Sequence, residues 1–157
     1  MAPAAETPSE RAQELVERVV EALGLEASVE VREDAETLTA EVHGDSDDLG
    51  LLIGRHGQTI DALQHLAYRT AFRGDGDRKR LVVDAAGYRE RREATLRHDG
   101  DRAADDAVRL GRPVELDPMN AVERRVVHEH LRERGDVETH SEGDEPARRL
   151  VVSPLEP

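Results

Sequence analysis

Two glycines three residues apart, Gly54 and Gly57, interrupt the stretch LLIGRHGQTIDALQHL, which runs from Leu51 to Leu66. One apolar pattern of helical spacing stops just before Gly54, and another begins within a turn of Gly57, which predicts a helix, a tight loop and a second helix. Gly54 can adopt φ > 0 without strain, and Gly57, which lacks a Cβ, allows another backbone to come close. The loop leads into a helix N-terminus, whose unpaired N–H groups and dipole favour an anion such as phosphate.

Spacing alone also fits a plain helix end followed by a turn of the chain. The pattern Ile53-Gly54-x-x-Gly57-x-x-Ile60, however, resembles the signature of KH domains, whose G-x-x-G loop clamps a short single-stranded RNA backbone. The longer run GQTIDALQ, residues 57–64, resembles the KH domain of the bacterial Jag/KhpB (SpoIIIJ-associated) family. This resemblance implies RNA contacts from the loop and the turn after it: Ile53, Gly54, Arg55, His56, Gly57, Gln58 and Thr59.

The segments around the motif predict a KH domain over residues 9–85. Residues 1–8 indicate a disordered lead-in, and Ser9 is the expected N-cap of an amphipathic helix that ends at Gly24. The elements expected after it are a β-hairpin of strands 27–32 and 37–42, a short helix capped by 45–48 and ending at Ile53, a helix over 58–72, a turn at 74–77 and a strand at 79–84. This α-β-β-α-α-β order is that of a type II KH fold, an α+β architecture with helices on one face of a three-stranded sheet.

Residues 86–157 predict a second, small α+β domain. A long charged helix is expected over 88–110, with a bend or break near Gly100 as one possibility. Asp117 and Pro118 then match an N-cap followed by a proline at the first helical position, which predicts a helix over 119–133. The residues expected to face inward on that helix are Val122, Val126, Val127 and Leu131, and the extended segments expected around it are 112–116, 136–140 and 148–152.

Arg124 and His128 form a second motif, because residues four apart share one face of a helix. A solvated helix with local polar contacts would show the same pair. The segments PMNAVERRVVH (118–128) and THSEGDEPARR (139–149) nevertheless resemble the Arg-x-x-x-His domain that follows KH in the Jag/KhpB proteins and is associated with single-stranded nucleic acid. The resemblance implies binding by Arg124 and His128, with Arg125 and Arg148 or Arg149 as helpers, and the expected ligands are single-stranded RNA and single-stranded DNA.

Charge and composition limit the remaining function classes. The net charge is −13, but residues 1–50 carry −11 of it, whereas residues 52–92, around the glycines, carry +4. A nucleic-acid contact would therefore be local. The absence of cysteine excludes disulfides and thiolate chemistry and fits a cytoplasmic protein, as does the lack of an apolar run of about 20 residues that could insert into a membrane.

No pattern in the sequence supports catalysis or a cofactor. His128-Glu129-His130 lacks the spacing of a helical zinc motif, because residues two apart point to different faces of a helix, and Asp75 and Asp77 lack the rest of a calcium loop. No metal site and no enzymatic activity are expected.

Two functions remain open at this point. One is an RNA-binding protein that regulates transcripts; the resemblance adds a link to cell-wall growth and cell shape, and a small KH-only protein as partner. The other is a protein-interaction adaptor that recruits a partner through its acidic N-terminal surface. Family members often carry a further N-terminal Jag domain, whereas here roughly ten residues precede the first expected helix.

Overall fold

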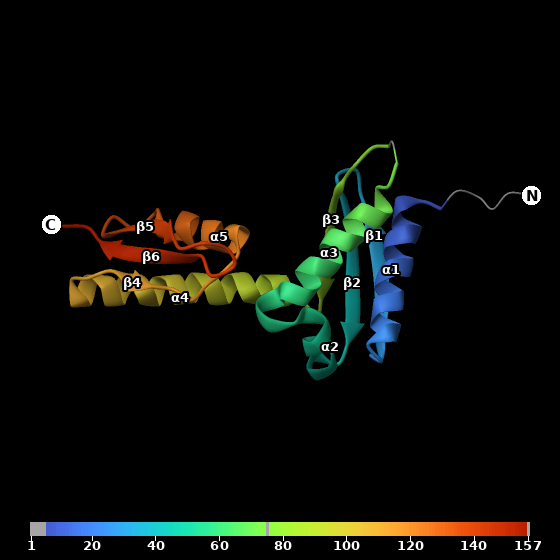
Figure 1. Cartoon of the computed structure of the whole chain (residues 1–157), viewed down its shortest axis with the longest axis horizontal. Helices are drawn as coiled ribbons and strands as arrows, with labels where there is room; N and C mark the ends of the chain where they lie inside the picture. Colours follow the sequence, from blue (N-terminus) through green and yellow to red (C-terminus); the bar gives the residue numbers. More distant parts are fainter. Residues whose placement is uncertain (1–5, 75, 157) are drawn as a thin grey trace, which may run out of the picture. The chain divides into compact units, whose positions relative to one another are not determined.

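The computed structural model describes residues 6–74 and 76–156, which divide into two compact units, 1–89 and 90–157 (Figure 1). The α+β class is confirmed, with a KH-like unit first and a small α+β unit after it. No helix in the described ranges is both long and apolar enough to cross a membrane.

The first unit contains the predicted α-β-β-α-α-β order. Its elements are α1 (Pro8–Ala22), β1 (Ala27–Glu33), β2 (Thr37–Gly44), α2 (Ser46–Ile53), the short 3₁₀ turn η1 (Arg55–Gly57), α3 (Gln58–Ala71) and β3 (Arg80–Ala85). The sheet has the order β1-β2-β3, with β1 antiparallel and β3 parallel to β2. Asp75, in the predicted turn 74–77, lies outside the described residues.

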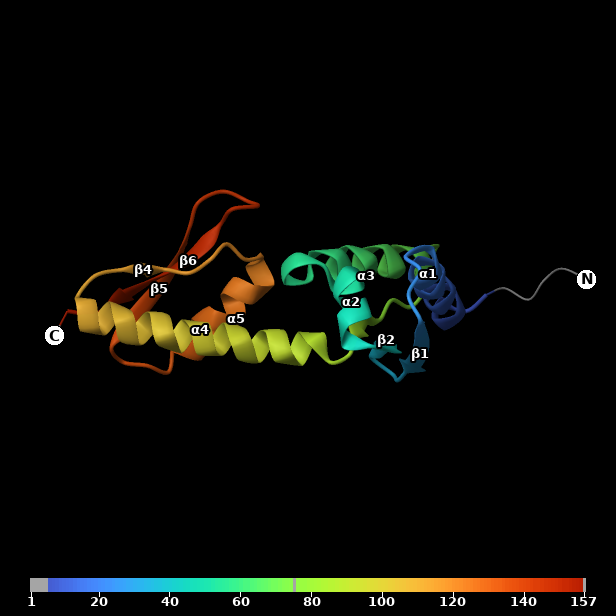
Figure 2. The same cartoon turned by 90° about the horizontal axis from the view of Figure 1, so that it is seen from below.

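One face of this sheet carries the core of the unit. Every second residue of β2 is buried, and α1 and α3 cover that face (Figure 1; Figure 2). Alternation in the strand and helical spacing in the helices therefore meet in a single apolar layer. The side chains at its centre are Val16, Leu38, Val42, Ile60 and Val83.

The start of α1 differs from the prediction. Thr7, not Ser9, is the N-cap: its side chain accepts from the backbone N–H of Glu10, and the Glu10 carboxylate accepts from the Thr7 N–H in return. This capping box places Pro8 at the first helical position, where its missing N–H costs nothing. The predicted lead-in 1–8 is therefore too long, and of its residues 1–5 lie outside the described range.

The second unit packs two helices against a small antiparallel sheet. Its elements are α4 (Tyr88–Leu110, which begins in the first unit), β4 (Val114–Glu115), α5 (Ala121–Leu131), β5 (Val137–Glu142) and β6 (Arg149–Pro154), with the sheet order β4-β6-β5. The core side chains include Leu96, Ala104, Val127, Leu131 and Val152.

Gly100 does not break α4, which continues through it as one helix of 23 residues. Gly100 is buried, and a Cβ built on it would lie 2.8 Å from Cγ1 of Val127 on α5. Glycine serves close helix packing here rather than a bend, since it removes the side chain at the point where α5 approaches.

The predicted cap of α5 is also wrong. Asn120 is the N-cap and forms a capping box with Glu123, while the backbone before it stays extended, because Met119 N–H donates to the Arg148 carbonyl. The helix starts at Ala121, and its inward stripe shifts with it. Val127 and Leu131 are buried as predicted, whereas Val122 is 73% exposed.

Candidate nucleic-acid interface

The glycine loop, residues 54–57, joins α2 to α3 through three backbones with positive φ. Gly54 has φ 73°, His56 has φ 53° and Gly57 has φ 76°. The predicted positive φ at Gly54 is confirmed, and Gly57 shares it. His56 is one of the few residue types that adopt this left-handed region with modest strain.

Both glycines lie against side chains rather than against another backbone. A Cβ on Gly54 would lie 2.2 Å from Oγ1 of Thr59, and one on Gly57 would lie 2.7 Å from Cε1 of Tyr88. The close approach predicted at Gly57 is confirmed, although the neighbour is a ring. Thr59 thus supports the loop from the first turn of α3.

The side chains of Arg55 and His56 are exposed at the tip of this loop. Neither makes a hydrogen bond or ion pair with another residue in the described part of the chain. Gln58 is also exposed, and Ile53 is half-buried against the core beneath it. The loop therefore presents a guanidinium and an imidazole beside the N-terminus of a 14-residue helix, where a phosphate is favoured.

In the second unit, one concave pocket of about 370 Å³ collects most of the other predicted residues. We call it the α5 pocket. It is lined by Arg124, Arg125 and His128 of α5, by Thr139 and Ser141 of β5, and by Arg148. Arg149 is not among these lining residues, and its guanidinium pairs with Glu115 at 2.8 Å.

The groups in this pocket differ in how free they are. His128 Nδ1 is hydrogen-bonded to the Thr139 hydroxyl, which fixes the ring and leaves Nε2 available. Arg148 donates to the Gly143 carbonyl at 2.8 Å. Arg125 is well exposed and pairs with Glu129, and its hydrogen bond holds the pKa of that carboxyl below the ordinary value.

Arg124 is the exception, because it is buried, with 7% of its surface exposed. Its Nη1 donates to the Met119 carbonyl at 2.6 Å and its Nη2 to Glu145 at 2.8 Å. The guanidinium thus ties the start of α5 to the segment before β6. A phosphate reaches Arg124 only by sharing it with Glu145 or by displacing that carboxylate.

This geometry predicts that Arg124 stabilises the second unit while Arg125 does not. Arg124→Met keeps the length of the side chain but leaves the Met119 carbonyl without its charged donor, which should cost about 1–3 kcal/mol. Arg125→Met, at an exposed position, should change stability by less than about 0.5 kcal/mol. Amide hydrogen exchange over α5 in the full chain measures both, and equal protection in the two variants would contradict the prediction.

Comparison with known families agrees with the two-unit architecture. The KH domain model of KhpA/KhpB matches residues 13–83, and the model of the Arg-x-x-x-His domain matches residues 94–154. The RNA-binding protein KhpB of Clostridium symbiosum is 37% identical over 150 residues, 94% of this chain and 67% of that protein. The chain belongs to the KhpB family.

Two further KhpB proteins extend the comparison. The RNA-binding protein KhpB of Bacillus subtilis is 31% identical over 148 residues, which make up 93% of this chain and 70% of that protein. The RNA-binding protein KhpB of Lactiplantibacillus plantarum is 39% identical over 86% of this chain, and the match spans 41% of that protein.

Sequence reasoning did not assign a role to three polar residues in the second unit of this KhpB-family chain. Thr139 and Ser141 line the α5 pocket, and Glu145 holds Arg124. A signal for the first two was present: residues two apart on a strand share a face, and both lie in the segment that resembles the family. The pairing of Arg124 with Glu145 depends on how the chain folds back, which local spacing does not encode.

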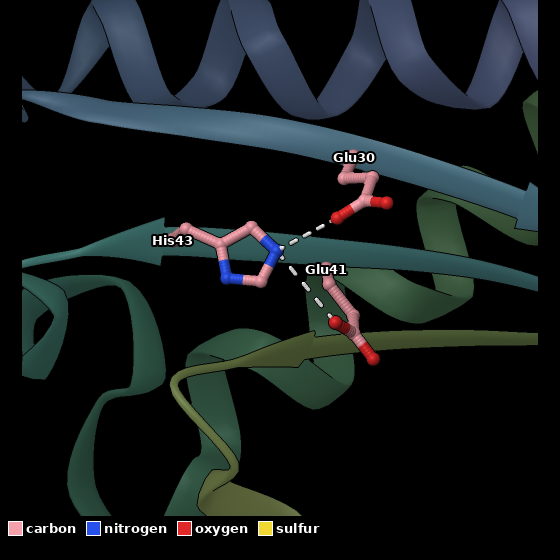
Figure 3. A group of neighbouring side chains, drawn as sticks. All are labelled: Glu30, Glu41 and His43. Atoms are coloured by element: carbon pink, nitrogen blue, oxygen red, sulfur yellow. Dashed lines mark hydrogen bonds and ion pairs between the residues drawn. The ribbon is translucent and has the colours of Figure 1, made fainter.

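Among the described residues, one group has the donor atoms for a metal ion. Figure 3 shows Glu30 of β1 converging with Glu41 and His43 of β2 on the KH sheet. His43 Nε2 lies 3.3 Å from Glu30 and 3.6 Å from Glu41. The Arg32 guanidinium also binds Glu30 at 3.0 Å and, with His43, holds the pKa of that carboxyl below its ordinary value. The cluster is thus already balanced by its own cations.

The two histidines of His128-Glu129-His130 have separate partners. His128 is bonded to Thr139, whereas His130 Nε2 lies 3.0 Å from Asp101 on α4. The helix turns them to different faces, as the spacing predicts.

Proposed function

We propose that this chain is a non-catalytic protein that binds single-stranded RNA at two places, the glycine loop and the α5 pocket. The observation that carries the proposal is the pair Arg55 and His56, which the loop presents without intramolecular partners in the described residues. A phosphate placed there meets a guanidinium and the N–H groups of a helix N-terminus together.

The α5 pocket supports a second contact. Arg125, His128 and Arg148 converge there, and Thr139 holds the His128 ring in place. Charged hydrogen-bond donors around a concave surface suit a phosphate backbone. Single-stranded DNA carries the same phosphates, so it belongs in the same measurements. Relatives that are named RNA-binding proteins support the ligand class.

The biological role that fits is post-transcriptional regulation in the cytoplasm, with a link to cell-wall growth and cell shape. The resemblance to the Jag/KhpB family is its source. A small KH-only protein is the partner we propose, because the matching family model covers the KH domains of both KhpA and KhpB.

Filter binding of the full chain to two lengths of single-stranded RNA tests the two-site proposal. A KH loop holds about four nucleotides, so a five-nucleotide strand occupies one site, whereas a strand long enough to reach both sites gains from their effective concentration. Arg125→Ala with His128→Ala should weaken the long strand by at least about tenfold and the short one much less.

Two other outcomes have clear meanings. Equal losses for both lengths would show that the second unit adds no linked site. No binding of either strand by the unaltered chain would refute the proposal and leave the adaptor, with its acidic N-terminal surface, as the better account.

A further inference from the structure

The start of α4 packs beneath the glycine loop. The Tyr88 ring, at the first position of α4, lies so close to Gly57 that a Cβ there would be 2.7 Å from Cε1, 2.8 Å from the hydroxyl oxygen and 3.1 Å from Cζ. Gly57 is buried by this contact, and Tyr88 itself packs against the core of the first unit. The ring therefore fills the space in which a side chain at position 57 would lie.

The turn before α4 directs Tyr88 toward the loop. Ala86 and Gly87 both have positive φ, 49° and 67°, and alanine adopts that region only where its surroundings hold it. Asp84 Oδ1 accepts from the backbone N–H groups of Ala85 and Arg89, which closes the turn.

Arg89 then fastens this turn to α3. Its Nε donates to the Val83 carbonyl at 2.9 Å, Nη1 to Asp61 at 2.8 Å and Nη2 to Gln64 at 3.0 Å. Asp61 and Gln64 lie in the first two turns of α3, directly after the loop. One guanidinium thus links β3 to the helix whose N-terminus faces the proposed phosphate.

A loop with three positive-φ residues loses much conformational freedom when it binds a ligand, unless it is already ordered. Tyr88 touches Gly57, and Arg89 holds the helix that Gly57 caps. Neither side chain belongs to the loop or to the matched KH region, which ends at residue 83.

We propose that Tyr88 and Arg89 are positioning residues for the RNA-binding loop, so that the functional KH unit extends through residue 89. This inference rests on the proposed function. The pair orders the loop before RNA arrives and contacts no phosphate itself.

The test compares Tyr88→Leu with Tyr88→Phe in the full chain. The leucine variant loses the flat ring under Gly57, and we expect about a tenfold loss of affinity for a five-nucleotide single-stranded RNA, together with faster amide exchange at residues 54–59. The phenylalanine variant keeps the ring and should stay within about twofold of the unaltered chain.

Tyr68→Leu is the matched control. Tyr68 also packs on the first unit's core, against Phe72 at 5.2 Å between ring centroids, but at the opposite end of α3 from the loop. It should reduce stability and leave both RNA affinity and loop exchange unchanged. An equal loss of affinity in this control would show a global effect of stability and overturn the positioning role.

The salt dependence separates positioning from direct contact. Because Tyr88→Leu removes no phosphate contact, the slope of log K on log salt should stay unchanged, whereas Arg55→Ala should make it shallower by about 0.7. A shallower slope in Tyr88→Leu would overturn the inference in favour of a direct contact.

Loop exchange without RNA keeps the inference distinct from the proposed function. If the unaltered chain binds no RNA, faster exchange in Tyr88→Leu still supports ordering of the loop by Tyr88, while the RNA proposal fails. If Tyr88→Leu does not fold, Arg89→Lys carries the test, since lysine keeps the charge but not the three-way donor geometry. Unchanged exchange and affinity in the folded variant would refute the role.

Discussion

Arg55→Asp combined with His56→Asp should remove most single-stranded RNA binding, at least about a hundredfold, and leave the fold intact. Hydrogen bonds to charged groups contribute about 1.5–3 kcal/mol each, and the two carboxylates also repel a phosphate. Neither original side chain has a partner in the described residues whose loss would destabilise the unit. Aspartate also tolerates the positive φ of position 56.

The matched control is Arg18→Asp with His98→Asp, which replaces the same residue types at exposed positions on α1 and α4 and changes the net charge equally. Filter binding measures affinity, and circular dichroism verifies the fold of each variant. A folded Arg55→Asp/His56→Asp variant that binds as tightly as the control would show that the glycine loop is not the RNA site.

The first unit could be predicted from sequence because its signals are local. Alternation marks β1 and β2, helical spacing marks α1 and α3, and the glycines mark the loop between α2 and α3. Each signal acts within a few residues, and together they admit one element order. The error at Thr7 is of another kind: Thr7 and Ser9 are both good N-caps, and the reciprocal bond from Glu10 decides between them.

The errors in the second unit have a common source, the docking of α5. Gly100 resembles a helix breaker, yet it is the place where Val127 approaches α4. Asp117 and Pro118 resemble a helix start, yet the Arg148 carbonyl keeps that backbone extended as far as Met119. Tertiary contacts override the local propensity in both cases, and the apolar pattern does not encode them.

Arg124 shows the limit of the facing-pair argument for the candidate site. It is four residues from His128, but it is also three and seven residues from Val127 and Leu131, which are buried. The stripe that packs inward therefore takes Arg124 with it, and the Met119 carbonyl and Glu145 offset the cost of burial. His128 lies at the edge of this stripe and keeps one ring nitrogen free.

Tyr88 gave no signal in the sequence because its contact with Gly57 spans 31 positions along the chain. Only the turn at Ala86 and Gly87, which comes after the last strand of the KH sheet, brings the two together. Local patterns therefore indicate the residues that we propose to face a phosphate, and the structure is needed to find those that hold them in place.

The salt dependence of binding is the second large effect we expect. If single-stranded RNA touches only the glycine loop and the α5 pocket, it neutralises about 3–5 phosphates, and log K should fall with log salt with a slope of about −2 to −3.5. A tenfold rise in salt then weakens binding by about a hundredfold to a few thousandfold. Arg124 and Arg125 each share their charge with a carboxylate, which argues for the shallower end of this range.

Duplex DNA should bind poorly at physiological salt, because a rigid duplex cannot follow two confined sites and must also pass the acidic residues 1–50, which carry a net charge of −11. Filter binding of single-stranded RNA and duplex DNA at several salt concentrations measures both quantities together. A slope much steeper than about −5 needs more phosphate contacts than the two sites offer. Such a slope, or duplex DNA bound as tightly as single-stranded RNA, would mean that a broad basic surface dominates recognition and that the two-site proposal is wrong.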